Sequence, residues 1–190
     1  MKTVWFDALL LVVTALVVVV LRFTVVETYE VYQTSMEPNF YEGQRLVVNK
    51  AAYWGWMGEP QRGDVIIFKS PNGSDENFIK RVIGLPGDTI KVVSGSIYVN
   101  DVKLEESYVK RSFTYSFPAQ EVPEGNYFVL GDNRDVSNDS HRGWLLPREN
   151  IIGKAFLIYW PPRDWGTVPA YHLDEQLTGT ASPLFFPAVN

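Results

Sequence analysis

The longest apolar run of the chain lies close to its N-terminus. Between positions 4 and 26, every residue is apolar except Asp7, Thr14, Arg22 and Thr24. At about 1.5 Å of helical rise per residue, the stretch from 5 to 21 would cover roughly 26 Å, close to the thickness of a bilayer's hydrocarbon core. A cleaved signal peptide is the rival interpretation, but the bulky residues 21–26 offer no small-x-small cleavage site. The pattern therefore predicts a retained transmembrane helix.

From residue 27 onward, the apolar positions occur in short runs bounded by turn-forming residues, which is the pattern of β-strands. The expected strands are 44–49, 64–69, 78–83, 89–93, 96–100, 127–130 and 155–160. Residues 93–97, Val-Ser-Gly-Ser-Ile, have the composition of a tight hairpin turn. The predicted fold class is therefore mainly β, with an N-terminal single transmembrane helix followed by a β-rich core that carries a small β insertion.

This pattern divides the chain into four parts. They are a transmembrane anchor over 1–26, a β core over 27–88 and 127–162, a small β insertion over 89–126, and a C-terminal tail over 163–190. Within the tail, residues 181–189 are too few and too rich in proline to cross a membrane. We expect them to form a loose end.

The composition narrows the possible functions. The 190 residues suffice for one domain with a small appendage. The absence of cysteine excludes a disulfide framework, a thiol nucleophile and a thiolate metal site. A formal net charge of −5 argues against a nucleic-acid partner.

Lys80 stands out because it lies in the middle of an apolar strand. In an extended strand, Lys80 shares one face with Phe78 and Val82, while the neighbouring Arg81 points to the other face. Both faces are apolar, so Lys80 is expected to be buried, and burial disfavours the charged form of an amine. A neutral lysine is a base, whereas a guanidinium does not lose its proton in proteins. The ordinary alternative is a lysine that extends to water or pairs with a carboxylate.

Ser35 is the candidate nucleophile for such a base. It follows the apolar N-terminal run closely and precedes Pro38, which fixes a rigid turn. A serine hydroxyl becomes a good nucleophile when a nearby base removes its proton, and Ser-Lys pairs are one known arrangement. Taken alone, Ser35 is more typical of an ordinary turn serine.

A dense polar loop, residues 131–143, directly follows an expected apolar strand, and such loops often carry function. A calcium loop fits poorly here, because the required glycine is absent and Leu146 occupies the place of the closing glutamate. A Ser-His-Asp triad that uses His141 and Asp139 is another possibility. Nothing in the sequence, however, positions His141 near Ser35.

Together these clusters resemble the type I signal peptidases, the membrane-anchored Ser-Lys endopeptidases that remove signal peptides. The resemblance covers the chain from the apolar run to about residue 162. The motifs that carry it are, in order, Ser35-Met36-x-Pro38, Arg62-Gly63-Asp64-Val65, Lys80-Arg81-Val82-Ile83-Gly84-Leu85-Pro86-Gly87-Asp88 and Gly131-Asp132-Asn133-Arg134-Asp135-x-Ser137-x-Asp139-Ser140. By this resemblance the β-rich core is the catalytic part of the chain.

The resemblance implies a role for each matched residue. Ser35 is the nucleophile and Lys80 the general base. Ser137 orients the lysine, and Asp139 belongs to the polar network beneath the site. The backbone N–H of Ser35 is one oxyanion donor. The side-chain amide of Gln33 is the candidate for the second donor, because Gln33 stands where the family often has Ser or Gly.

The polar loop departs from the family's pattern at His141, where many members carry arginine. The ion pair of Asp139 is then weaker, or it borrows Arg142. A further stretch, residues 53–58, is an aromatic turn that either enters the membrane interface or caps the β core.

The family binds its substrate as an added strand, with pockets for small residues, typically alanine, at the first and third positions before the cut. β-Augmentation of this kind supplies backbone hydrogen bonds, and the pockets read alternate side chains. Candidate wall residues beside the matched catalytic positions are Val31, Tyr32, Met36, Phe40 and Ile79. Each of them is equally consistent with ordinary core packing.

The predicted function is that of a membrane-bound serine endopeptidase that cleaves N-terminal signal peptides from secreted preproteins after small residues of the Ala-x-Ala type. The expected partners are these signal peptides and the lipid bilayer, without nucleic acid, cofactor or metal. The resemblance implies a single-pass protein of the cell membrane with its catalytic domain on the extracytoplasmic face. The alternatives are a non-catalytic membrane-tethered β binding module and a self-cleaving Ser-Lys protease. The simultaneous presence of Ser35, Lys80 and Ser137 favours the peptidase.

Overall fold

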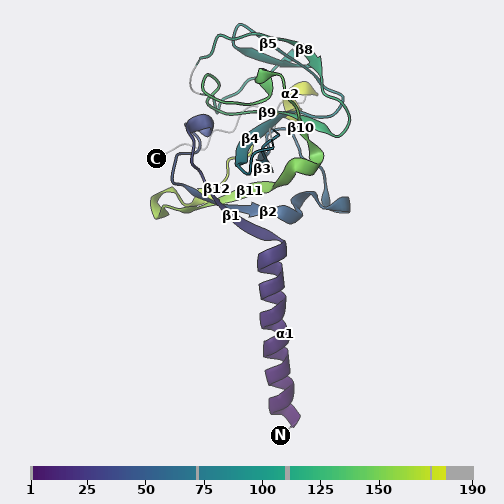
Figure 1. Cartoon of the computed structure of the whole chain (residues 1–190), viewed down its shortest axis with the longest axis vertical. Helices are drawn as coiled ribbons and strands as arrows, with labels where there is room; N and C mark the ends of the chain where they lie inside the picture. Colours follow the sequence, from purple (N-terminus) through teal and green to yellow (C-terminus); the bar gives the residue numbers. More distant parts are fainter. Residues whose placement is uncertain (1, 72, 110–111, 172, 179–190) are drawn as a thin grey trace.

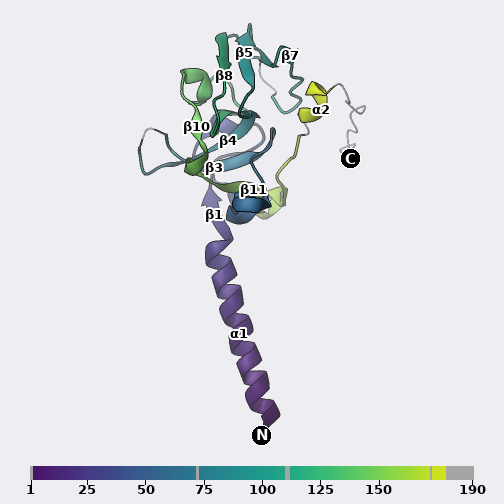
Figure 2. The ribbon, with the colours of Figure 1, turned by 90° about the vertical axis from the view of Figure 1, so that its right-hand side faces the viewer.

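The computed structural model describes residues 2–71, 73–109, 112–171 and 173–178. Helix α1, Lys2–Thr24, extends from a β-rich body and carries the N-terminus at its far end (Figures 1 and 2). Across the described residues, no helix combines the length and the apolar character that a membrane crossing requires. The apolar run therefore forms a helix, as expected, and its insertion into a membrane stays a prediction.

The larger of two sheets contains eight strands, and its neighbouring strands run antiparallel. Its main path is β1 (Val26–Glu30), β2 (Arg45–Asn49), β11 (Ile151–Trp160), β3 (Val65–Lys69), β4 (Asn77–Gly84), β9 (Asn126–Leu130) and β10 (Leu146–Pro147). A short strand, β12 (Gly166–Thr167), pairs with β11 beside this path. Since β1 ends the path, one of its edges has no partner strand within the described chain.

The smaller sheet lies at the end of the body opposite α1 (Figure 1). Its four strands follow the order β7 (Val102–Lys103), β6 (Ser96–Val99), β5 (Thr89–Val93) and β8 (Phe117–Glu121). All four strands come between β4 and β9 in the sequence. The β5–β6 turn contains Ser94 and Gly95 with positive φ angles of 45° and 76°, so the expected hairpin turn is present.

The helices of the body are short. The 3₁₀ segments are η1 (Thr34–Met36), η2 (Lys50–Tyr53), η3 (Gly55–Met57), η4 (Ser140–Arg142), η5 (Arg148–Asn150) and η6 (Pro162–Asp164). One α-helical turn, α2 (Asp174–Leu177), lies near the C-terminal end of the described chain. The mainly β class is confirmed.

The core explains why β3 is a continuous apolar run. Val65 and Ile67 belong to one buried cluster, whereas Ile66 and Phe68 belong to another. Successive side chains of a strand point to opposite faces. The larger sheet is therefore covered on both faces at β3, which allows a polar residue of the adjacent β4 to be fully desolvated.

The seven strands expected from the sequence are all present, with ends that differ by four residues at most. The sequence pattern missed β1, β7, β8, β10 and β12. Three of these have only two residues, and β1, Val-Glu-Thr-Tyr-Glu, lacks a regular alternation and follows directly on the long apolar run. Neither pattern stands out against its surroundings.

The segment that follows β12 packs on the body up to residue 178. Leu173 is buried in the cluster beneath the smaller sheet, and Asp174 pairs with Arg62 at 2.8 Å. The ring of Tyr171 lies 4.9 Å from the guanidinium of Arg81. This part of the tail is therefore integrated into the fold, and the loose end expected over 181–189 lies outside the described residues.

Candidate active site

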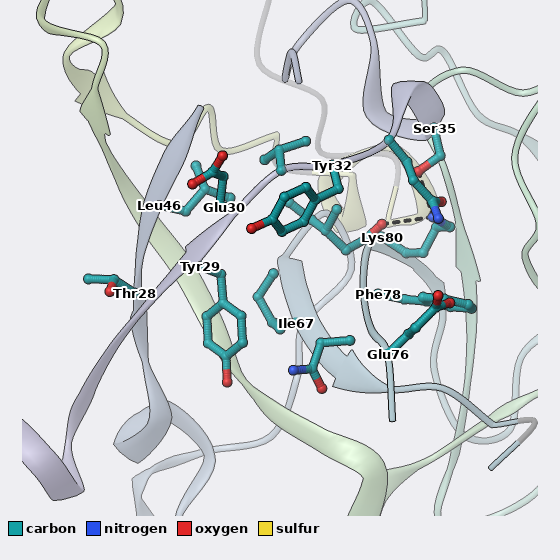
Figure 3. Close-up of a pocket in the computed structure, with 14 residues that line it drawn as sticks. Thr28, Tyr29, Glu30, Tyr32, Ser35, Leu46, Ile67, Glu76, Phe78 and Lys80 are labelled. Carbon is teal, nitrogen blue, oxygen red and sulfur yellow. Dashed lines mark hydrogen bonds between the residues drawn. The ribbon is translucent and has the colours of Figure 1, made fainter. Parts of the chain in front are cut away.

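The Lys80 amine and the Ser35 hydroxyl lie next to each other in the interior of the protein. Lys80 Nζ is 2.7 Å from Ser35 Oγ and also donates to the Ile79 carbonyl at 2.9 Å (Figure 3). Lys80 is 2% exposed and Ser35 is 5% exposed. The two residues are 45 positions apart in the sequence. The structure thus brings together the nucleophile and the base that the sequence suggested.

The Ser35 backbone is held by the polar loop that follows β9. The backbone N–H of Asn133 donates to the Ser35 carbonyl at 3.0 Å, and its side-chain amide donates to the Thr34 carbonyl at 3.1 Å. A Cβ atom at Gly131 would lie 2.4 Å from the same Ser35 carbonyl, so only glycine allows this approach. No role for Asn133 follows from the sequence pattern alone, although this residue lies inside one of the matched motifs.

Burial gives Lys80 the properties of a base. Desolvation lowers the pKa of Lys80 to about 8, while the charges of Asp139 and Asp132 act in the opposite direction. An amine with this pKa is neutral in a minority of molecules at pH 7 and in about half of them at pH 8. A neutral Lys80 can accept the proton of the Ser35 hydroxyl.

Arg81, on the opposite face of β4, is in a different environment. Its guanidinium binds the Asp132 carboxylate through two hydrogen bonds of 2.9 and 2.8 Å, and both side chains are fully buried. Asn39 adds a hydrogen bond of 2.9 Å to the same carboxylate. Arg81 therefore ties β4 to the polar loop, whereas the Lys80 amine contacts the Ser35 hydroxyl and the Ile79 carbonyl.

The polar loop places Ser137 and Asp139 in the interior beneath the pair. Ser137 is fully buried, and its hydroxyl has no hydrogen-bond partner within the described residues. Asp139 is also fully buried and accepts a hydrogen bond of 2.8 Å from the Gly131 N–H. Its other oxygen lies 2.6 Å from His141 Nδ1. The carboxylate is thus paired with His141, and Arg142, the alternative partner, is exposed.

His141 does not complete a Ser-His-Asp triad in this arrangement. Its ring contacts Asp139 and stacks on Tyr115, with 4.4 Å between the ring centroids. None of its hydrogen bonds within the described chain reaches Ser35, whose hydroxyl faces Lys80 instead. The geometry favours the lysine as the base.

A groove of about 400 Å³ opens beside the Ser35–Lys80 pair (Figure 3). Its walls come from β1 with the residues after it and from the first half of β4. The residues that line it are Thr28, Tyr29, Glu30, Val31, Tyr32, Gln33, Ser35, Leu46, Ile67, Glu76, Asn77, Phe78, Ile79 and Lys80. The strand pairing explains the opening, because β1 is an edge strand and β4 pairs with β9 only from Arg81 onward. Two free strand edges therefore border the groove.

Three of the five expected wall residues line this groove. These are Val31, Tyr32 and Ile79. Met36 and Phe40 do not line it, because both are fully buried in the apolar cluster beneath β2 and β3. Phe78, which the strand pattern already places on the Lys80 face, also lines the groove, and so does Glu76, which directly precedes β4 and was not singled out from the sequence. Their alternate spacing from Lys80 is the signal that identifies them.

In the described part of the chain, no group of three or more His, Asp or Glu residues is placed to hold a metal ion. Gln33 lies at the groove, where it precedes η1 without capping it through its side chain. The polar side-chain groups at the groove include the Ser35 hydroxyl, the Lys80 amine and the Gln33 amide.

Comparison with known proteins gives a consistent picture. The family model described as "Signal peptidase, peptidase S26" matches residues 4–160. The chain is similar to a protein named probable signal peptidase I-1 from Synechocystis sp., with 41% identity over 85% of each chain. It is also similar to signal peptidase I from Leptolyngbya laminosa, with 40% identity over 80% of this chain and 78% of the relative. A crystal structure of a signal peptidase I from Enterococcus faecalis matches with a TM-score of 0.47, at 35% identity over 51% of this chain and 97% of that one.

Proposed function

The chain belongs to the peptidase S26 family of signal peptidases, and we propose that it removes signal peptides from secreted preproteins by means of a Ser35–Lys80 dyad. The observation that carries this proposal is the distance of 2.7 Å between a buried lysine amine and a buried serine hydroxyl. Family membership makes the chain a serine endopeptidase and sets aside the non-catalytic binding module. The dyad gives the chemical route.

In the proposed reaction, neutral Lys80 accepts the proton of the Ser35 hydroxyl as Oγ attacks the carbonyl carbon of the scissile peptide bond. The resulting ammonium then protonates the leaving amine, the C–N bond breaks, and an ester to Ser35 Oγ remains. Lys80, neutral again, takes a proton from a water molecule that attacks this ester, and it returns that proton to Ser35 Oγ as the C–O bond breaks and the new C-terminus is released. Both half-reactions use the same proton acceptor, so no metal is needed.

Three nearby groups support the dyad in this proposal. The Ser35 N–H and the side-chain amide of Gln33 donate to the oxyanion, since Gln33 lies at the groove. Ser137 orients the amine. A neutral amine has two N–H groups, one of which donates to the Ile79 carbonyl, and the buried hydroxyl of Ser137 lacks a partner in the described residues. The second N–H of Lys80 would fill that need.

The groove suits an extended peptide. A substrate strand between β1 and β4 would pair with two free strand edges at once, which is β-augmentation from both sides. Val31, Tyr32 and Ile79 line the groove and are proposed to limit the pockets to small side chains, which fits cleavage after Ala-x-Ala sequences. The residues before the cut would occupy this groove.

We also propose α1 as a single-pass membrane anchor that leaves the β body on the extracytoplasmic face. The support is the apolar run from 4 to 26 and the exposure of the side chains along the middle of α1, which projects from the body (Figure 2). Close to the start of the body, the Lys50 N–H donates to the Val25 carbonyl at 2.8 Å. The adjoining turn exposes Trp56 at 92% and Trp54 at 48%, which suits contact with the bilayer interface.

The test uses the full chain in detergent and a labelled preprotein. Cleavage at the signal junction is expected, and Ser35→Ala should abolish it. Ser116→Ala, which removes a hydroxyl from an exposed position outside the groove, should cleave normally. Persistent junction cleavage by Ser35→Ala would overturn the proposal, and cleavage of the enzyme alone would favour the self-cleaving protease.

A further inference from the structure

His141 contacts Asp139, one of the two carboxylates whose charge affects the pKa of Lys80. The Nδ1 atom of His141 is 2.6 Å from Asp139 Oδ1, and the backbone N–H of His141 donates to the same oxygen at 3.3 Å. The side chain of Asp139 is fully buried and that of His141 is 9% exposed. A buried carboxylate is costly unless it has hydrogen-bond partners, and the His141 ring lies within hydrogen-bond distance of this one.

Asp139 is coupled to the dyad in two ways. Its second oxygen holds the Gly131 N–H at 2.8 Å, and Gly131 packs so closely that a Cβ atom there would lie 2.3 Å from Ser137 Oγ. Its negative charge also counteracts the burial that lowers the pKa of Lys80. A change in the charge beside Asp139 therefore alters the buried network that borders Lys80.

Among the charged groups around His141 in the described chain, Asp139 is the one that contacts its ring. On the other side, the ring stacks on Tyr115, from the loop that precedes β8, with 21° between the ring planes. The charged groups that act on Tyr115 besides Asp139 are Arg134, Glu106 and Asp135. Arg134 and Glu106 form a mutual ion pair of 2.6 Å, and Arg142, next to His141, is exposed.

We propose that His141 is a positioning residue that sets the basicity of Lys80 through Asp139. An imidazole can carry a proton or release it in the pH range of cell fluids, whereas a guanidinium keeps its charge throughout. A charged His141 cancels the charge of Asp139 and lowers the proton affinity of Lys80. A neutral His141 leaves the charge of Asp139 uncancelled and so raises the proton affinity of Lys80. This inference rests on the proposed function, in which Lys80 is the general base.

The test compares two variants with opposite charge behaviour. His141→Arg is charged at every assay pH, and His141→Gln is never charged but can still donate to Asp139. Each variant is assayed for peptide cleavage from pH 6 to 10, and the acid limb of kcat is fitted. The limb of His141→Arg should lie below that of His141→Gln by about one pH unit, with the wild type at or between these limits. A purely structural role would change the rate at every pH and leave both limbs in one place, which would overturn the inference.

A second measurement does not depend on the folding of those variants. By linkage, the charge of Lys80 must shift the titration of His141 as much as His141 shifts that of Lys80. The chain has two histidines. Their imidazole signals are followed by NMR in the wild type and in Lys80→Met, with His172→Ala to assign them. The titration of His141 should move to higher pH in Lys80→Met, and an unchanged titration would overturn the inference.

The two proposals fail in different ways. If Lys80→Met cleaves preprotein as well as the wild type, the dyad itself is wrong. If Lys80→Met is inactive and both His141 variants cleave with identical acid limbs, only the role of His141 is wrong.

Discussion

Replacing Lys80 with arginine separates the charge of this side chain from its basicity. The pKa of about 8 for Lys80 means that the amine is neutral in about one molecule in eleven at pH 7, in half at pH 8 and in roughly nine in ten at pH 9. If the neutral amine is the base, kcat/KM of the wild type should rise about fivefold from pH 7 to 8 and less than twofold from pH 8 to 9. Lys80→Arg cannot follow this curve, because its guanidinium stays protonated. Its rate should fall by a factor on the order of 10² to 10⁴, the usual contribution of a general base.

The assay is the cleavage of a synthetic signal-junction peptide by the detergent-solubilised full chain, with products separated by chromatography. Lys80→Met, which removes both charge and basicity, should be as inactive as Lys80→Arg. Lys103→Arg, a substitution at an exposed position far from the groove, should keep the wild-type profile. An active Lys80→Arg enzyme, or a wild-type rate that does not change between pH 6 and 9, would refute the reasoning.

Three further substitutions test the frame around the dyad. Gly131→Ala would place a methyl group 2.3 Å from the Ser137 hydroxyl. Urea titration should show a loss of about 1–3 kcal/mol in the free energy of unfolding, and the peptide assay should show a larger fall in cleavage rate than the unfolded fraction explains. Arg81→Met strands the buried Asp132 carboxylate and should cost about 3–5 kcal/mol in the same titration, much of it recovered when Asp132→Asn is added. Leu173→Ala should cost about 2–5 kcal/mol because this side chain is 2% exposed, whereas a change near zero would show that the C-terminal segment does not hold the fold together.

The sequence predicted those parts of the fold that depend on local pattern. The four apolar residues at the start of β3 are buried in two different clusters, as a strand covered on both faces requires. The alternation around Lys80 correctly indicated that this lysine is buried. By contrast, β1 was missed because its polar residues, Glu27, Thr28 and Glu30, do not alternate regularly with apolar ones and follow directly on the long apolar run. Its strand conformation depends on pairing with β2, which lies further along the chain.

The contacts that complete the site depend on distant parts of the chain. Arg62 binds Asp174, which is 112 positions later, and the ring of Tyr115 reaches His141 from the loop before β8. Neither contact leaves a periodic signal, because each involves one residue from each of two irregular segments. The family resemblance could name Ser35 and Lys80 because their motifs are local. It could not tell how a histidine in place of the usual arginine pairs within the loop.

The difference between Lys80 and Arg81 shows how the fold gives two adjacent cations different surroundings. Because side chains alternate along β4, Lys80 and Arg81 point to opposite faces, and of the two only Arg81 binds Asp132 of the polar loop. Arg81 receives the fully buried Asp132, and in the described chain no carboxylate lies within ion-pair distance of Lys80. An ion pair at Lys80 would oppose the lowering of its pKa by burial. The fold therefore keeps Asp139 and Asp132 close enough to affect the pKa of Lys80 without binding its amine. In the proposed mechanism, the depth of burial and the charge state of this network together decide how much neutral lysine is present to activate Ser35.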